Sequence, residues 1–196
     1  MIAIIDYGAG NLKSIINACR LLGYETNLVS DPRDLKDADR IILPGVGNFG
    51  PALSALAPYK GVLLDAFADD TPILGICLGI QLFLEGSDES PGVDGLGLFK
   101  GHCLKLPSSV KIPHMGWNNV SFIRDTPLTA GLDDNSLFYF VHSFYPVPGE
   151  EIIVGETDYG IKFASIIGKG NVYATQFHPE KSGETGLRLL GNFLGL

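Results

Sequence analysis

The amino-terminal part of the chain alternates between short apolar runs and stretches with helical periodicity. Between Leu12 and Leu22 apolar side chains recur every three or four residues, with Asn11 as a candidate N-cap and Gly23 as a candidate stop. Residues 61–70 indicate a second helix. Runs of strand length lie at residues 2–6, 25–30, 40–45 and 72–76, and the first suits a strand buried on both faces. Strands that alternate with helices predict an α/β protein with a mainly parallel sheet.

After Gly92 the pattern changes to short strand-like pieces separated by turns. These pieces predict an antiparallel extension of the sheet, and they cover residues 96–107, 119–123, 136–147, 151–159, 161–167 and 171–177. Residues 182–196 predict a closing helix. Because no repeat, low-complexity tract or linker interrupts the chain, we expect a single domain over residues 1–196.

Charge and composition narrow the classes of function. The chain has a net charge of −8 and no run of basic side chains, which disfavours a nucleic-acid partner. The longest uncharged run, residues 41–59, is broken by prolines and is unsuited to a membrane helix. The amino terminus lacks the basic region of a signal peptide. Three cysteines without C-x-x-C spacing disfavour a disulfide framework or a zinc site, so a cytoplasmic protein without a bound metal is expected.

Residues 75–79, Gly-Ile-Cys-Leu-Gly, have the spacing of a nucleophile elbow with Cys77 at its centre. In such an elbow a strand turns sharply into a helix, and the glycines relieve crowding around a strained nucleophile. The start of the helix would favour a thiolate, and the Leu78 N–H would face a forming oxyanion. A small cysteine packed in the core explains the same residues equally well, so the spacing alone leaves both interpretations open.

Among the four histidines, His178 has the surroundings expected of a base for a thiol. It ends a predicted strand, and Pro179 keeps it out of helical conformation. Glu180 follows two residues later and can orient the imidazole, as the third member of a catalytic triad does. Taken alone, His-Pro-Glu is more simply interpreted as a surface turn. Together with the elbow at Cys77, the three residues favour catalysis.

Residues 43–50 form a glycine-rich segment directly after a predicted strand. Its glycines do not match the G-x-G-x-x-G spacing of a dinucleotide-binding loop. Gly45 and Gly47 suit a loop whose backbone approaches a ligand closely, so a second oxyanion donor could come from this segment. Gln81, four residues after Cys77, returns to the same face of the helix predicted there.

The segments GICLGIQ, PGVG and FHPEKS resemble the three signatures of class I, triad-type glutamine amidotransferases. DYGAGNL, PHMGWN at residues 113–118 and FVHSFY at residues 140–145 are similar to segments of the glutaminase subunits of imidazole glycerol phosphate synthases. The similarity extends over nearly the whole chain. It implies a flavodoxin-like, three-layer α/β fold that needs no cofactor. It also implies that the chain hydrolyses L-glutamine to glutamate and ammonia through a cysteine thioester.

The resemblance assigns roles to individual residues. Cys77 is implied to be the nucleophile, His178 its base and Glu180 the partner of that base. The backbone amides of Leu78 and Val46 are implied to form the oxyanion hole. The residues implied to hold the substrate are Gly45, Gly47, Gln81, Glu89, His142 and Ser143. Those implied to lie at a subunit interface or ammonia gate are Asn11, Tyr139 and Lys181.

A glutaminase of this kind needs an acceptor enzyme, because free ammonia in water becomes ammonium and loses its nucleophilicity. The resemblance implies a separate (β/α)8-barrel cyclase subunit as partner in a heterodimer. That subunit would use the ammonia to make imidazole glycerol phosphate and an aminoimidazole carboxamide nucleotide in histidine biosynthesis.

Three other interpretations stay open from the sequence. The chain could be the glutaminase subunit of a different synthase, a stand-alone cysteine hydrolase, or a binding module that has kept the fold. The PHMGWN and DYGAGNL segments disfavour the first, and the intact Cys77, His178 and Glu180 disfavour the last. For Tyr139, packing within a strand is an alternative to a role as a gate.

Overall fold

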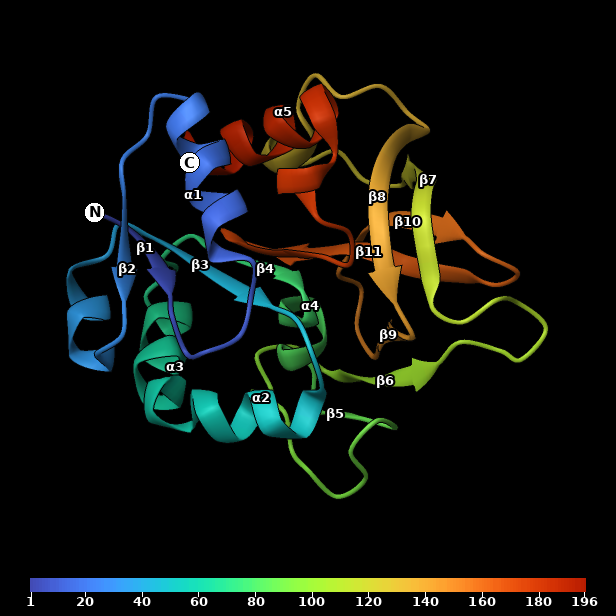
Figure 1. Cartoon of the computed structure of the whole chain (residues 1–196), viewed down its shortest axis with the longest axis horizontal. Helices are drawn as coiled ribbons and strands as arrows, with labels where there is room; N and C mark the ends of the chain where they lie inside the picture. The colour runs from blue at the N-terminus through green and yellow to red at the C-terminus, as the bar shows by residue number, and fades with distance from the viewer.

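The computed structural model describes residues 1–196 and is built around a nine-stranded sheet (Figure 1). Five neighbouring strands run parallel in the order β2-β1-β3-β4-β12. Their bounds are Ile2–Ile5 for β1, Thr26–Val29 for β2, Arg40–Gly45 for β3, Ile73–Cys77 for β4 and Val172–Thr175 for β12. This is the strand order of flavodoxin-like folds, as the resemblance implied.

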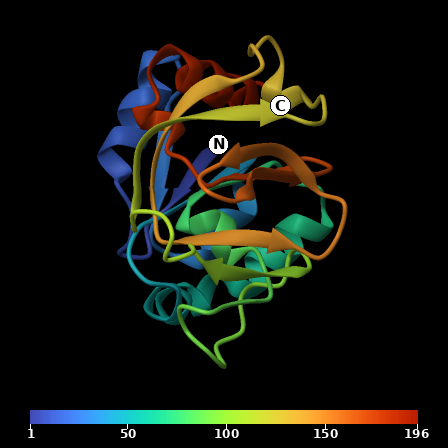
Figure 2. The same cartoon turned by 90° about the vertical axis from the view of Figure 1, so that its right-hand side faces the viewer.

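The sheet continues beyond β12 in antiparallel strands, which confirms the predicted extension. Outward from β12 these are β11 (Lys162–Lys169), β10 (Ile153–Asp158), β7 (His114–Phe122) and the edge strand β8 (Ser136–His142). A second sheet joins β5 (Gly86–Ser87), β6 (Gly101–Lys105) and β9 (Phe144–Pro148). This small sheet lies below the antiparallel half of the large one in both views (Figures 1 and 2).

Helices cover both faces of the large sheet and complete three layers (Figure 1). One face carries α1 (Leu12–Leu21) and α5 (Gly183–Leu194), and the other carries α2 (Phe49–Leu56) and α3 (Lys60–Ala68). The short helix α4 (Leu78–Leu82) directly follows β4. Short 3-10 helices are η1 (Pro32–Asp37), η2 (Ala57–Tyr59), η3 (Pro127–Thr129) and η4 (Pro179–Lys181). None of the helices is long and apolar enough to span a membrane.

Strand β1 illustrates why the apolar runs become central strands. Ala3 and Ile5 pack in the apolar core on one face of the sheet, whereas Ile2 and Ile4 pack in the core on the other face. Alternate side chains of a strand point to opposite faces, so a strand covered by helices on both sides must be apolar throughout. The interpretation of residues 2–6 as a strand buried on both faces is confirmed.

Three elements differ from the expectation. Helix α2 was not predicted, because Gly50 and Pro51 look like helix breakers. Pro51 lies in the first turn, where a helix has no use for the missing N–H. The piece at residues 136–147 divides at Ser143 into β8 and β9, which belong to different sheets. Strand β7 begins at His114, so most of the PHMGWN segment is strand.

The strand order brings distant parts of the chain to one edge of the sheet. Strand β3 ends at Gly45 and the adjacent β4 ends at Cys77, with the two residues paired in register. Strand β12, on the other side of β4, ends shortly before His178. Ligands of open α/β sheets bind outside the carboxyl ends of the strands, so this edge is the expected place for a site.

Candidate active site

Cys77 occupies the strained turn that the G-x-C-x-G spacing predicts. Its backbone angles are φ 57° and ψ −104°, in the left-handed region that a residue other than glycine rarely adopts. The flanking glycines permit close approach of the chain. A Cβ at Gly79 would lie 2.6 Å from the Leu43 carbonyl oxygen, and one at Gly75 would lie 3.0 Å from Gly79 and Phe83. The turn therefore presents Cys77 at the end of β4 because both glycines lack a side chain.

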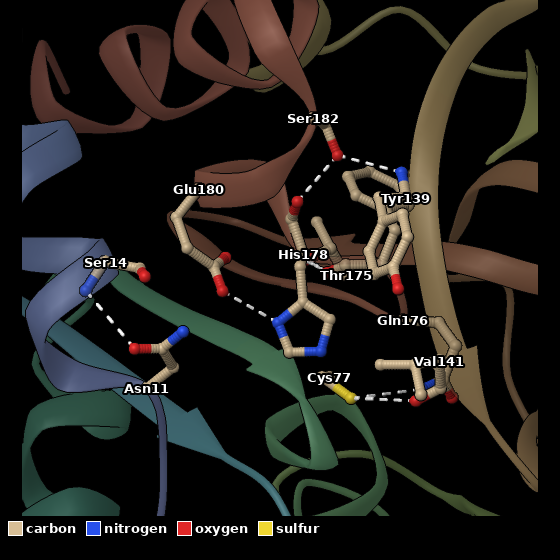
Figure 3. A network of polar contacts seen from close by, with 11 residues as sticks. Asn11, Ser14, Cys77, Tyr139, Val141, Thr175, Gln176, His178, Glu180 and Ser182 are labelled. Atoms are coloured by element: carbon tan, nitrogen blue, oxygen red, sulfur yellow. Dashed lines mark hydrogen bonds and ion pairs between the residues drawn. The ribbon is translucent and has the colours of Figure 1, made fainter. Parts of the chain in front are cut away.

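His178 and Glu180 form a buried pair beside this turn (Figure 3). His178 Nδ1 lies 2.8 Å from Glu180 Oε1, and the two side chains are almost completely shielded from solvent. The opposite ring nitrogen, Nε2, faces Cys77 and has no hydrogen-bond partner. Cys77 Sγ instead donates a weak hydrogen bond to the Val141 carbonyl oxygen, at 3.7 Å. The thiol and the imidazole thus lie close together but are not hydrogen-bonded to each other.

The electrostatics of this pair favour a charged imidazole. Burial by itself lowers the pKa of His178, but the interactions with the sulfur of Cys77 and the carboxylate of Glu180 outweigh burial and raise the pKa to about 10. His178 is therefore a base strong enough to take the thiol proton of Cys77 and to keep it at neutral pH, with Glu180 as the counterion of the imidazolium.

The backbone around His178 is fixed by the edge strand β8. The His178 N–H donates to the Tyr139 carbonyl oxygen at 2.9 Å, and the Tyr139 N–H donates to Ser182 Oγ at 2.9 Å. Ser182 Oγ in turn donates to the His178 carbonyl oxygen at 2.6 Å. Both outward-facing backbone groups of Tyr139 are therefore bonded to the segment that carries the histidine (Figure 3).

A cavity of about 450 Å³ opens above the turn. Its wall includes nine of the residues proposed from the sequence, namely Val46, Gly47, Cys77, Leu78, Gln81, Glu89, His142, Ser143 and His178. Asn48, Pro113, Val141 and Phe144 complete the lining. Segments from the β3 loop, the elbow, the β8–β9 turn and the end of β12 thus converge on one space that is large enough for an amino acid.

Comparison with known proteins places this site in a family. The model of the family "Glutamine amidotransferase class-I" matches residues 3–195. The chain belongs to this family. It is 51% identical over 197 residues to "Imidazole glycerol phosphate synthase subunit HisH" of Methanocaldococcus jannaschii, with all of both chains covered. It is 47% identical to the protein of that name from Bacillus cereus (strain G9842), with 100% of this chain and 95% of the relative covered. The predicted resemblance is confirmed.

Solved structures agree on the fold of this amidotransferase. PurLQS from Thermotoga maritima superposes with a TM-score of 0.79 at 24% identity, covering 99% of this chain and 97% of that one. A structure described as a glutamine amidotransferase superposes with a TM-score of 0.75 at 18% identity, covering 100% and 98%. At these identities the likeness concerns the fold.

Two polar residues of the cavity already have partners inside the amidotransferase. Gln81 Nε2 donates to the Phe144 carbonyl oxygen at 3.1 Å and to Gln176 Oε1 at 3.2 Å, which leaves Gln81 Oε1 as an acceptor. Glu89 Oε2 accepts a hydrogen bond of 2.7 Å from the Phe49 N–H, at the start of α2. Each side chain is therefore held in place and keeps one oxygen for a ligand.

His142 lies in the wall of the cavity with both ring nitrogens occupied. Nδ1 is 2.9 Å from the Phe144 carbonyl oxygen and Nε2 is 2.9 Å from His114 Nδ1. The imidazole therefore has no free polar atom for a substrate. The implied role of His142 in holding the substrate stays a prediction, and this geometry points to its backbone and its support of the β8–β9 turn, not to its ring nitrogens.

Five residues singled out from the sequence lie outside the cavity wall. Gly45 is buried against Leu78, where a Cβ would come within 2.7 Å of the Leu78 Cβ, so its contribution is close packing of β3 on the elbow. Glu180 lies behind His178, as a triad residue should. The other three lie nearer the surface. Asn11 caps α1 by accepting from the Ser14 N–H at 3.4 Å, Tyr139 is half-buried on β8, and Lys181 is exposed on η4.

Sequence reasoning missed two residues of the site. Gln176 is fully buried, pairs with Gln81 and directs Nε2 toward Cys77 Sγ at 4.0 Å. Ser182 fixes the backbone of His178. Ser182 is the last residue of the FHPEKS segment and Gln176 directly precedes it, so a glutamine two residues before the histidine was a usable signal. No group of three or more His, Cys, Asp or Glu side chains is arranged to hold a metal ion.

Proposed function

We propose that this chain is the glutaminase subunit of an imidazole glycerol phosphate synthase and hydrolyses L-glutamine to glutamate and ammonia. The observation that carries the proposal is the placement of Cys77, on its strained turn, beside the buried His178–Glu180 pair at one cavity. A thiol, a base and a carboxylate in this arrangement are the parts that acyl transfer needs. Full-length relatives at about half identity carry the name of the synthase subunit.

In the proposed reaction His178 Nε2 takes the thiol proton, and Cys77 Sγ attacks the side-chain amide carbon of glutamine. The tetrahedral intermediate collapses with cleavage of the C–N bond, and His178 gives its proton to the departing ammonia. Water then hydrolyses the γ-glutamyl thioester. The N–H of Leu78, the first residue of α4, has no acceptor within that helix, and together with the N–H of Val46 it would hold the oxyanion.

The amino-acid end of glutamine would lie against the opposite wall. Gln81 Oε1 and the free oxygen of Glu89 are acceptors for the substrate ammonium group. The backbone at Gly47 and at residues 142–143 would receive the carboxylate. His142 takes part by holding this turn, since its own nitrogens are already used.

The Val46 donor is proposed to be adjustable. Val46 is exposed and lies between Gly45 and Gly47, and Gly47 has φ +100°. A peptide between glycines can take either orientation at low steric cost. We infer that the Val46 N–H turns into the oxyanion hole when the partner subunit binds its own ligand. Structures with and without that ligand test this, and an unchanged loop with the donor already in place would contradict it.

The proposed partner is a cyclase subunit with a (β/α)8-barrel fold, which would receive the ammonia without loss to solvent. A surface on the β7–β8 hairpin supports such docking. Trp117 is opposite Tyr139 on neighbouring strands, with ring centroids 6.1 Å apart, and Met115 is on the same face. The side chains of Trp117 and Met115 are 56% and 62% exposed. We propose that these residues, together with Asn11 and Lys181, contact the cyclase.

Glutaminase assays with and without the cyclase subunit and its ligand test the proposal directly. We expect glutamine hydrolysis to rise when both are present, because the completed oxyanion hole stabilises the intermediate. Turnover that ignores both would instead identify a stand-alone hydrolase on the same fold.

Replacing Lys181 with alanine is expected to weaken assembly with the cyclase or to uncouple the two activities. The side chain is exposed and forms no ion pair within the chain, so it is available for a carboxylate on the partner. Exposed ion pairs contribute up to about 1 kcal/mol, which corresponds to a rise in Kd of up to about fivefold. Titration calorimetry and the ratio of synthase to glutaminase turnover measure the two effects. Unchanged affinity and coupling would exclude Lys181 from the interface.

The alkaline limb of the pH profile should report His178. Because its pKa is raised to about 10, the imidazolium persists through neutral pH and is lost as the pH rises toward that value. Above this limb kcat/KM for glutamine should fall, since no acid remains to protonate the leaving ammonia. Glu180→Gln removes one of the interactions that raise the pKa, so the limb should move to lower pH. A limb unmoved by Glu180→Gln would show that another group titrates there.

A further inference from the structure

A chain of hydrogen bonds leads from strand β7 to the β8–β9 turn behind the cavity. Asn118 Nδ2 lies 3.2 Å from His114 Nε2, His114 Nδ1 lies 2.9 Å from His142 Nε2, and His142 Nδ1 lies 2.9 Å from the Phe144 carbonyl oxygen. Both imidazoles are buried, with 3% of His114 and 6% of His142 exposed. The residues of β7 have no role in the proposed reaction, so this connection needs its own explanation.

Only one arrangement of protons satisfies every hydrogen bond in this series. A carbonyl oxygen can only accept, so His142 carries its proton on Nδ1 and, being neutral, accepts at Nε2. His114 must then donate from Nδ1 and accept at Nε2 from the amide of Asn118. The orientation of that amide is fixed, because its Nδ2 also donates to the Asp158 carbonyl oxygen at 3.0 Å and its Oδ1 accepts from the Asn119 N–H at 2.8 Å. The Asn118 amide at one end of the series and the Phe144 carbonyl oxygen at the other therefore require the same donor-to-acceptor direction in every hydrogen bond between them.

The end of this chain meets the substrate side of the cavity. The Phe144 carbonyl oxygen, which receives the His142 proton, also receives a hydrogen bond from Gln81 Nε2 at 3.1 Å. That bond determines that Gln81 Oε1, not Nε2, is left for a ligand. Ser143, between the two bonded residues, lines the cavity. If His142 carried its proton on Nε2, its hydrogen bond to the Phe144 carbonyl oxygen would be lost. The turn would then be held less firmly, and so would the carbonyl oxygen that helps to orient the Gln81 amide.

We propose that His114 is a positioning residue for glutamine: by donating to His142 it fixes the tautomer that holds the β8–β9 turn and the Gln81 amide in their binding geometry. The inference rests on the proposed function of the cavity. His114 itself does not line the cavity, so its effect is transmitted through His142 and Phe144.

The surroundings keep both rings neutral, as this role requires. His114 lies between Phe140 and Tyr159, with ring centroids 4.8 Å and 3.9 Å away, and Phe163 packs edge-on against His114 and at a tilt against His142. Burial lowers the pKa of His114 to about 4 and that of His142 to about 3. The titratable groups that face the pair are His178 and the Tyr159 phenol, and no carboxylate lies close enough to stabilise a charged ring.

Two substitutions of His114 separate positioning from packing. Phenylalanine keeps an aromatic ring between Phe140 and Tyr159 but cannot donate to His142. Asparagine leaves a gap but places an amide N–H where Nδ1 was. For positioning, the KM for glutamine in the assembled synthase should rise about tenfold or more in His114→Phe with little change in kcat, and by less than about threefold in His114→Asn. A packing role predicts the reverse order, and that order or an unchanged KM in His114→Phe would overturn the proposal.

Nitrogen NMR of the histidine rings in the wild-type chain tests the arrangement without any variant or any assay. We expect His114 and His142 both to carry the proton on Nδ1 and to stay neutral at pH values where an exposed histidine, with a pKa of about 6.5, is charged. In His114→Phe the fixed tautomer of His142 should be lost. A wild-type His142 protonated on Nε2 would refute the proposal even if the chain proves to be a glutaminase. A synthase without glutaminase activity would leave this ring measurement intact and refute the proposed function instead.

Discussion

Replacing Cys77 with alanine will abolish glutamine-dependent synthesis in the assembled synthase and leave synthesis from added ammonia near the wild-type rate. The sulfur forms the bond to glutamine in the proposed reaction, so kcat for glutamine hydrolysis should fall about 10⁴-fold or more. Added ammonia enters after that step and does not need the thiol. Measuring both activities on one preparation of the complex gives the ratio that decides the matter.

Cys19→Ala provides the matched control. Cys19 is fully buried, but it belongs to α1, faces the apolar core and does not line the cavity. We expect this variant to lose some stability and to keep the ratio of the two activities. If Cys77→Ala loses both activities whereas Cys19→Ala keeps them, Cys77 supports the fold or the assembly. If Cys77→Ala retains glutamine-dependent synthesis, the nucleophile is another group.

A single methyl group at Gly79 should damage both the fold and the chemistry. Alanine normally stabilises a helix relative to glycine by about 1 kcal/mol. At this position the new Cβ would lie 2.6 Å from the Leu43 carbonyl oxygen, a backbone atom of a central strand. Helix α4 would have to move away, and Cys77 and Leu78 would move with it. We expect Gly79→Ala to lower the free energy of unfolding by about 2–3 kcal/mol and the glutaminase rate by about 100-fold or more.

Gly61→Ala is the matched control, because it tests the helix propensity of alanine at a position where the new side chain meets no other atom. Gly61 is exposed on α3, and a Cβ there meets nothing within 4 Å. The free energy of unfolding should therefore rise by about 0.5–1 kcal/mol with no change in glutaminase activity. Denaturant unfolding of both variants makes the comparison. A similar gain in Gly79→Ala would mean that the turn has room for a side chain, contrary to the close approach described above.

The parallel half of the fold was predictable because its strands are buried on both faces and carry an unbroken apolar signal. In the antiparallel half the predicted strands exist, but several of them begin or end at other residues than predicted. The break at Ser143 carries neither glycine nor proline, and what separates β8 from β9 is pairing with different sheets. Such a separation depends on contacts between residues far apart in sequence, which periodicity does not contain. Helix α2 was missed for the opposite reason, since Pro51 is a strong local signal whose position in the first turn makes it harmless.

The chemistry of the site was visible in the sequence where it depends on short spacing. Cys77, His178 and Glu180 each belong to a compact motif, and the fold brings these motifs together. The role of a side chain that acts through another residue was not visible in the same way. His142 was singled out, but its partner His114 lies on a different strand, and only the register of the two strands shows that Nε2 of His142 is occupied. Register between strands is a tertiary property that no local pattern records.

The position of β12 beside β4 has a consequence for how the protein folds during its synthesis. One edge of β4, the strand that ends in the proposed nucleophile Cys77, pairs only with β12. Strand β12, His178 and Glu180 all follow β4 by about a hundred residues. While the ribosome is still making the protein, the thiol is present on a strand with an open edge and without its base. We therefore expect a nascent or truncated chain that stops before residue 172 to be prone to aggregation through the open edge of β4 and to have no glutaminase activity. The proposed catalytic groups can therefore come together only when β12 has completed the sheet.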